Sequence, residues 1–172
     1  MPLLQRVTQA AINGAPSEAR PTGRVRMTAL RMLAQRRLTE AQLWERLARK
    51  GYSDAEIRST VESCKRDGFI DDTLFAKLYV DARVKAVGDA RLVADLVRRG
   101  IDREAAQRSV DEAERAEDER LGVAIEKLFR TRASLSYPSA ARALERLGFP
   151  ASSIYRELRV RARAEDSLTE SP

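Results

Sequence analysis

The chain contains few side chains that could carry out catalysis. Its 172 residues include no His and a single Cys, Cys64, so no imidazole can act as general base or zinc ligand and no internal disulfide can form. Asp71 and Asp72 are adjacent carboxylates of the kind that bind metals or transfer protons. No third ligand adjoins them, however, and they open a predicted helix, where carboxylates cap backbone N–H groups. The common glycine-rich phosphate loops are absent from the sequence. We therefore expect no catalytic residue, no metal and no cofactor, and a binding protein rather than an enzyme.

Basic side chains offer more chemistry, because they bind phosphate groups or acidic protein surfaces. Several lie three, four or seven residues apart and so share a face of a predicted helix. The alternative is that these cations only offset a helix dipole or cover a solvated face. Trp44, beside Leu43 and Leu47, could anchor an interface or pack in the core. The candidate partner-binding residues are Arg36, Arg37, Trp44, Arg46, Arg49, Lys50, Arg98, Arg99, Arg156, Arg159 and Arg163.

The net charge of +6 is unevenly distributed along the chain. Residues 24–70 hold 11 basic and 6 acidic side chains, residues 71–117 hold 9 and 11, and residues 118–166 hold 10 and 7. Basic outer thirds around a slightly acidic middle indicate an anionic partner, for example a nucleoprotein.

An internal repeat indicates how these residues are positioned. Gly51, Gly100 and Gly148 are 49 and 48 residues apart, and a Leu lies four residues before each. A large apolar residue follows each glycine, and further apolar positions recur six and ten residues after it. We interpret each Leu as the last core residue of a helix and each glycine as its left-handed end. The matching positions are Leu47, Leu96 and Leu144; Tyr52, Ile101 and Phe149; Ile57, Ala106 and Ile154; and Val61, Val110 and Leu158.

Helix start signals and apolar spacing complete the predicted architecture. Thr39, Ser53 or Asp54, Asp102 and Pro138 suit helix starts. One predicted core face has Phe75, Leu78, Tyr79 and Ala82 at i, i+3, i+4 and i+7. The predicted helices are 24–37, 40–50, 54–67, 72–86, 89–99, 103–115, 117–131, 138–147 and 151–164. The expected fold is all-α: three tandem three-helix, winged-helix-like repeats in an elongated, curved array. Its parts are a flexible arm (1–23), repeats at 24–70, 71–116 and 117–166, and a disordered tail (167–172).

Four segments resemble the RecX regulatory proteins: ALRMLAQRR at 29–37, TEAQL at 39–43, LARKGY at 47–52 and, most specifically, GFIDDTLFAKLYVDAR at 68–83. Gly88-Asp89 departs from the Gly-Pro often found in that family. The resemblance implies three tandem three-helix repeats and a regulator of homologous recombination and DNA repair. Such a regulator would bind in the groove of the filament that RecA recombinase forms on single-stranded DNA, and inhibit its ATPase, strand exchange and growth. We expect a cytoplasmic monomer that meets single-stranded DNA directly or within the filament, and no membrane partner.

A second hypothesis is a DNA-binding protein that lacks sequence specificity and consists of helix-turn-helix-like units. A helix that reads bases presents its early exposed residues to the groove. One candidate helix begins Asp54-Ala55-Glu56 and is therefore acidic where phosphates would lie. Sequence-specific recognition is thus disfavoured, whereas weak nonspecific binding fits the charge.

Overall fold

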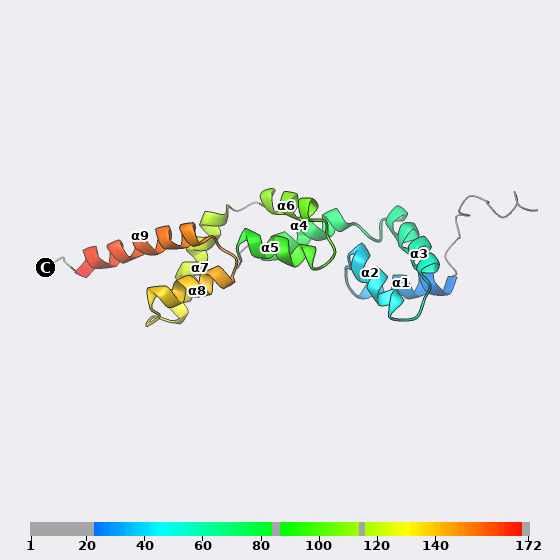
Figure 1. The fold of residues 1–172 in the computed structure, drawn as a ribbon, viewed down its shortest axis with the longest axis horizontal. Helices are drawn as coiled ribbons and strands as arrows, with labels where there is room; N and C mark the ends of the chain where they lie inside the picture. Colours follow the sequence, from blue (N-terminus) through cyan, green and yellow to red (C-terminus); the bar gives the residue numbers. More distant parts are fainter. Residues whose placement is uncertain (1–22, 84–86, 114–115, 170–172) are drawn as a thin grey trace, which may run out of the picture. The chain divides into compact units, whose positions relative to one another are not determined.

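The computed structural model describes residues 23–83, 87–113 and 116–169 (Figure 1). Every regular element within these ranges is an α-helix, and they contain no strand. The all-α prediction is therefore confirmed. The helices are α1 (Gly23–Gln35), α2 (Glu40–Ala48), α3 (Asp54–Arg66), α4 (Asp72–Arg83), α5 (Asp89–Val97), α6 (Arg103–Asp111), α7 (Glu117–Thr131), α8 (Tyr137–Arg146) and α9 (Ala151–Thr169).

The helices pack in three triplets, each around its own cluster of buried apolar side chains. α1–α3 surround the first cluster, α4–α6 the second and α7–α9 the third. The chain divides into two compact units: unit 1, Met1–Asp71, contains the first triplet, and unit 2, Asp72–Pro172, contains the other two. The predicted tandem three-helix repeats are confirmed.

Gly51, Gly100 and Gly148 follow the second helix of each triplet, as predicted. Their φ angles are +83°, +85° and +92°, in the left-handed region that costs glycine least. In each copy the residue after the glycine donates its N–H to the carbonyl of the Leu four positions before the glycine, at 3.4, 3.2 and 3.3 Å respectively. The three Leu side chains are fully buried. This turn stops the helix and directs the next apolar residue back toward the same core.

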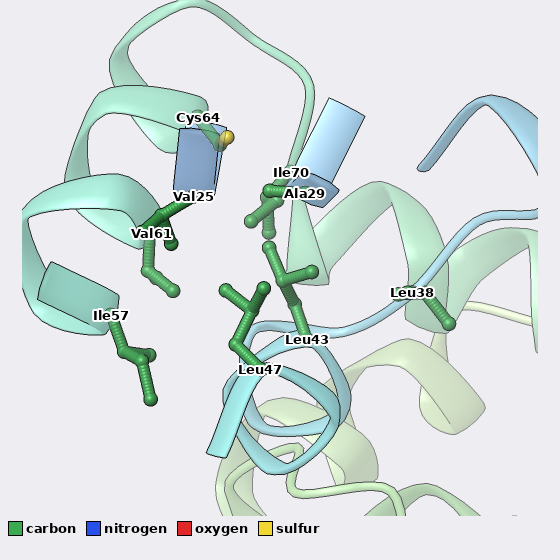
Figure 2. Packing of buried hydrophobic residues seen from close by; sticks show 9 residues of the cluster. All are labelled: Val25, Ala29, Leu38, Leu43, Leu47, Ile57, Val61, Cys64 and Ile70. Carbon is green, nitrogen blue, oxygen red and sulfur yellow. The ribbon is translucent and has the colours of Figure 1, made fainter. Parts of the chain in front are cut away.

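The first triplet shows how the turn places the core. Figure 2 shows Leu43 and Leu47 of α2 lying near Val61 of α3 and Ala29 of α1. All four are at most 1% exposed. Burying a branched side chain such as Leu or Val stabilises the fold by roughly 1.5–3 kcal/mol. A unit this small depends on nearly every one of these contacts.

Side-chain caps fix where the helices begin. Thr39 and Gln42 form the predicted capping box, in which the Gln42 N–H donates to Thr39 Oγ1 at 3.1 Å. Ser53 and Glu56 form a second capping box at α3. The Asp102 carboxylate accepts from two N–H groups at the start of α6. Each cap satisfies donors that the helix itself cannot use.

The buried face of α4 differs from the prediction. Leu78 is 41% exposed and Ala82 is also exposed, so neither belongs to the core as predicted. The fully buried residues are Ala76 and Val80, and the aromatic side chains of the predicted face pack at its edge. The prediction assigned the core face from the spacing of the large apolar residues, and so it passed over Ala76. Ala76 and Val80 share their buried cluster with Ala106 and Val110 of α6, and α4 contacts α6.

Several helix ends also differ from the prediction. α2 ends at Ala48 rather than at 50, because the turn leading to Gly51 has already begun. α9 continues to Thr169, past its predicted end at 164, so the boundary predicted at 166 falls inside a helix. The predicted arm up to residue 22, the end of the tail (170–172) and the predicted helix ends at 84–86 and 114–115 lie outside the described residues. The other domain boundaries remain predictions.

Within unit 2, the N-terminus of α5 meets the turn between α8 and α9. Gly88 donates its N–H to the Leu147 carbonyl at 2.9 Å. A Cβ atom at Gly88 would lie 2.3 Å from the carbonyl oxygen of Gly148, closer than real Cβ contacts allow. Only a glycine permits this approach of two backbones.

A buried ionic group reinforces the same contact. Arg120 of α7 is 1% exposed, donates to the Val87 carbonyl at 2.8 Å and forms an ion pair with Asp89. The Glu117 carboxylate accepts the Asp89 N–H at 2.8 Å. Burial raises the pKa of Glu117, and this N–H bond opposes the rise. The second and third triplets are therefore joined by hydrogen bonds and an ion pair as well as by the chain.

Candidate partner-binding surfaces

The end of α2 carries the most concentrated of the predicted basic groups. Arg46, Arg49 and Lys50 lie at i, i+3 and i+4, and Met32 of α1 lies beside them. The four side chains line an open depression of about 360 Å³. Arg49 forms a loose ion pair with Glu45 at 3.6 Å, and both side chains are about two-thirds exposed. The structure thus brings together three of the predicted residues, and it adds Met32, which no charge or spacing pattern in the sequence indicates.

Other predicted residues of unit 1 follow α1 or lie on α2. Arg36 and Arg37 are exposed just after α1. Among the described residues, neither of them has a side-chain hydrogen bond or ion pair, and the same holds for Arg46 and Lys50. Trp44 is half-buried and packs against the first core cluster. Its indole therefore supports the core from the edge, and its role in an interface remains a prediction.

The predicted pair that follows α5 has partners inside its own repeat. Arg98 forms an ion pair with Asp95, whose side chain is only 9% exposed. Arg99 donates to the Asp95 carbonyl at 2.6 Å, and its guanidinium lies 4.4 Å from the centre of the Tyr79 ring. Tyr79 in turn donates its hydroxyl to Asp95 at 3.1 Å. Arg98, together with Arg91 at 3.3 Å, thus compensates a nearly buried carboxylate, whereas Arg99 bonds to the backbone beside it. The sequence did not reveal these structural roles.

On α9 the first arginine of the predicted row has two ionic partners. Arg156 is paired with Asp118 at 2.8 Å and with its neighbour Glu157 at 3.4 Å. Hydrogen bonding to Glu157 and the charge of Asp118 raise the pKa of Arg156. Arg159 and Arg163 are exposed on the same helix. Arg161, which is not among the predicted residues, is half-buried with its guanidinium 4.6 Å from the Phe129 ring centre.

The groups considered for catalysis occupy structural positions. α4 begins at Asp72, so the Asp71–Asp72 pair lies at a helix start as expected. Cys64 is fully buried, and burial raises the pKa of its thiol, which disfavours the reactive thiolate. The described residues contain no group of three or more potential metal ligands. None of the described helices is long and apolar enough to cross a membrane.

Tandem three-helix units with exposed arginine and lysine clusters define a class of all-helical repeat proteins with basic surfaces. Residues 26–64 match the family model described as RecX, first three-helix domain. The chain is 31% identical over 159 residues to the regulatory protein RecX of Thermobifida fusca, covering 87% of this chain and 84% of that protein. The chain therefore belongs to the RecX family of regulatory proteins.

A second relative matches over about half of its length, and two solved structures are similar in fold. Identity to the regulatory protein RecX of Halorhodospira halophila is 36% over 89 residues, which is 51% of this chain and about half, 52%, of that relative. The crystal structure of RecX from Lactobacillus salivarius superposes with a TM-score of 0.68 at 19% identity, covering 80% of this chain and 96% of that one. A second crystal structure, of a regulatory protein RecX, gives a TM-score of 0.70 at 17% identity, with coverage of 92% and 79%. These structures support the three-repeat fold.

Proposed function

We propose that this chain regulates homologous recombination and DNA repair by binding the RecA filament on single-stranded DNA. Bound in the filament groove, it inhibits the filament's ATPase, strand exchange and growth. In this proposal it acts in the cytoplasm as a monomer, with no cofactor and no catalytic step of its own. The observation that carries the proposal is the match to a regulatory protein of the family over most of both chains.

The architecture supports a role in binding a long, repetitive partner. Three repeats of one helical plan in a single chain suit several simultaneous contacts with a filament of identical subunits. The exposed cations supply attraction to an anionic nucleoprotein. Because many contacts share the binding, single substitutions are expected to weaken it gradually.

The direct test is the rate of ATP hydrolysis by RecA on single-stranded DNA with increasing amounts of this protein. We expect the rate to fall in a saturable manner and the filaments, viewed by electron microscopy, to shorten. The heat-denatured protein at the same concentrations is the control. An unchanged ATPase and unchanged filament length at saturation would refute the proposal.

The second candidate is DNA binding without sequence specificity, favoured by the net charge of +6. The acidic first turn of α3, with Asp54 and Glu56, argues against base recognition by that helix. In this alternative, tight binding to naked DNA would occur without recombinase. The logarithm of the binding constant would fall steeply with the logarithm of salt concentration, because bound cations release counterions from phosphates.

A further inference from the structure

The depression at the end of α2 is lined by one apolar and three cationic side chains. Met32 is half-buried, packs against the core of unit 1 and lines the depression from α1. Arg46, Arg49 and Lys50 line it from α2 and from the turn that follows. A volume of about 360 Å³ can take one or two side chains of a bound segment. Such a lining suits a ligand that offers an apolar group and several negative charges together.

The three cations that line the depression are available for a ligand. Arg46 and Lys50 have no side-chain hydrogen bond or ion pair with any described residue, and Arg49 has only its exposed, 3.6 Å pair with Glu45. The Gly51 turn holds the last two of them at the helix end, because its N–H groups bond to the final α2 carbonyls. The fold therefore positions the site. A ligand would have to break only the weak, exposed ion pair between Arg49 and Glu45.

Two features favour carboxylates of a protein over phosphates of a nucleic acid. The lining side chain that is not charged is Met32, an adaptable apolar surface typical of peptide-binding sites. Single-stranded nucleic acids instead stack on aromatic rings, and none of the described residues that line this depression is aromatic.

We propose that this depression binds a carboxylate-rich peptide segment of the partner protein, with an apolar side chain of that segment against Met32. Arg46 and Arg49 bind carboxylates through two parallel N–H bonds, and Lys50 adds a third positive charge. The inference rests on the proposed function in one respect: it assigns this contact to the filament's protein subunits rather than to its DNA.

Binding is measured by fluorescence anisotropy on the full chain, with a short labelled peptide of Glu residues around a central Leu. The triple variant R46Q/R49Q/K50Q is expected to weaken binding of this peptide about tenfold or more. Met32→Gln keeps the side-chain length and is expected to abolish the preference for this peptide over one with a central Ser. A labelled oligothymidylate is measured in parallel.

The matched control is R31Q/R58Q/R66Q, which removes the same charge from exposed cations of unit 1 that do not line the depression. It should leave peptide binding within about twofold of wild type. Equal weakening by both triple variants would overturn the proposal, because net charge alone would then explain the affinity. Selective loss of oligothymidylate binding in R46Q/R49Q/K50Q, with peptide binding intact, would also overturn it.

RecA ATPase separates failure of the site from failure of the function. If the wild-type chain inhibits the ATPase and R46Q/R49Q/K50Q inhibits it equally well, the filament does not use this site; the inference fails and the proposed function stands. If the wild-type chain leaves the ATPase unchanged, the proposed function fails, and the anisotropy measurements still decide whether the depression binds acidic peptides. Parallel loss of peptide affinity and inhibition supports both.

Discussion

Replacing Gly88 with Ala tests the contact between the second and third triplets. The φ of −78° at Gly88 suits any residue, so the backbone of Gly88 itself is not strained by a methyl group. The new Cβ would, however, lie 2.3 Å from the Gly148 oxygen, 2.4 Å from its carbonyl carbon and 2.6 Å from the Phe149 nitrogen. All three are backbone atoms, so no side-chain rotation relieves the clash. The α8–α9 turn must move away from α5.

The cost follows from two terms. Overpacking of a close contact destabilises by about 1–3 kcal/mol. The movement also breaks the bond from Gly88 N–H to the Leu147 carbonyl, which contributes about 1 kcal/mol. We therefore expect Gly88→Ala to lower the free energy of unfolding by about 2–4 kcal/mol.

Two further Gly→Ala variants separate the causes. Gly122, inside α7, would place a new Cβ with no neighbouring atom within 4 Å and has no positive φ, so Ala should stabilise the helix by up to about 1 kcal/mol. Gly51 has equally open surroundings but a φ of +83°, so Ala there should cost about 1–2 kcal/mol from backbone strain alone. Of the three variants, only Gly88→Ala combines an ordinary φ with a steric clash.

Urea unfolding followed by two signals locates each effect. Circular dichroism at 222 nm reports all helices, whereas the fluorescence of Trp44, the single Trp, reports unit 1. Gly88→Ala should shift the dichroism transition to lower urea and leave the Trp44 transition nearly in place. Gly51→Ala should shift the Trp44 transition. If Gly88→Ala is as stable as Gly122→Ala, the two backbones are not in contact and the reasoning is wrong.

Three other expectations concern stability and reactivity. Thr39→Ala removes a buried capping box and should cost about 1 kcal/mol by urea unfolding, whereas Thr39→Ser should restore most of it; equal loss in both variants would contradict the capping role. Cys64, buried and with a raised pKa, should react with a thiol reagent at pH 8 many times more slowly in the folded chain than in urea, and equal rates would show an accessible thiol. Glu117→Gln keeps an oxygen acceptor for the Asp89 N–H and removes a charge that burial disfavours. Because the pKa of Glu117 in the folded chain lies above the ordinary 4.5, ionisation of Glu117 lowers the stability of the wild-type chain as the pH rises past 4.5. The free energy of unfolding of the variant should therefore exceed that of the wild type by more at pH 7 than at pH 4. A difference that does not change with pH would contradict this.

The repeat was predictable because it depends on local chemistry. A positive φ at Gly51 and its two counterparts, and a Leu four residues earlier, follow from the way any helix ends. The capping pair Thr39 and Gln42 is equally local. The face of α4 was not predictable in the same way, because whether Leu78 or Ala76 is buried depends on how closely α6 packs.

The contact between the two triplets of unit 2 could not be predicted from the sequence, because it too depends on tertiary packing. Asp89 donates its N–H to Glu117, a bond that a Pro at this position could not make. Its carboxylate also pairs with Arg120, which is 31 positions away in the chain. No spacing rule connects residues so far apart.

The candidate site shows that the number of basic residues does not predict which of them are available to a partner. Arg98 and Arg46 look alike in sequence, since each lies at or near the end of the second helix of its repeat. In the structure Arg98 pairs with the nearly buried Asp95, whereas Arg46 has no ionic partner among the described residues. A partner that binds Arg98 must compete with the nearly buried Asp95, which would then keep its ion pair with Arg91 and its hydrogen bond from Tyr79 but lose the charge of Arg98. A partner that binds Arg46 has no such competitor. Attraction for an anionic partner is therefore expected to be stronger at the end of α2 than at the equivalent end of α5, although the two helices hold the same place in their repeats.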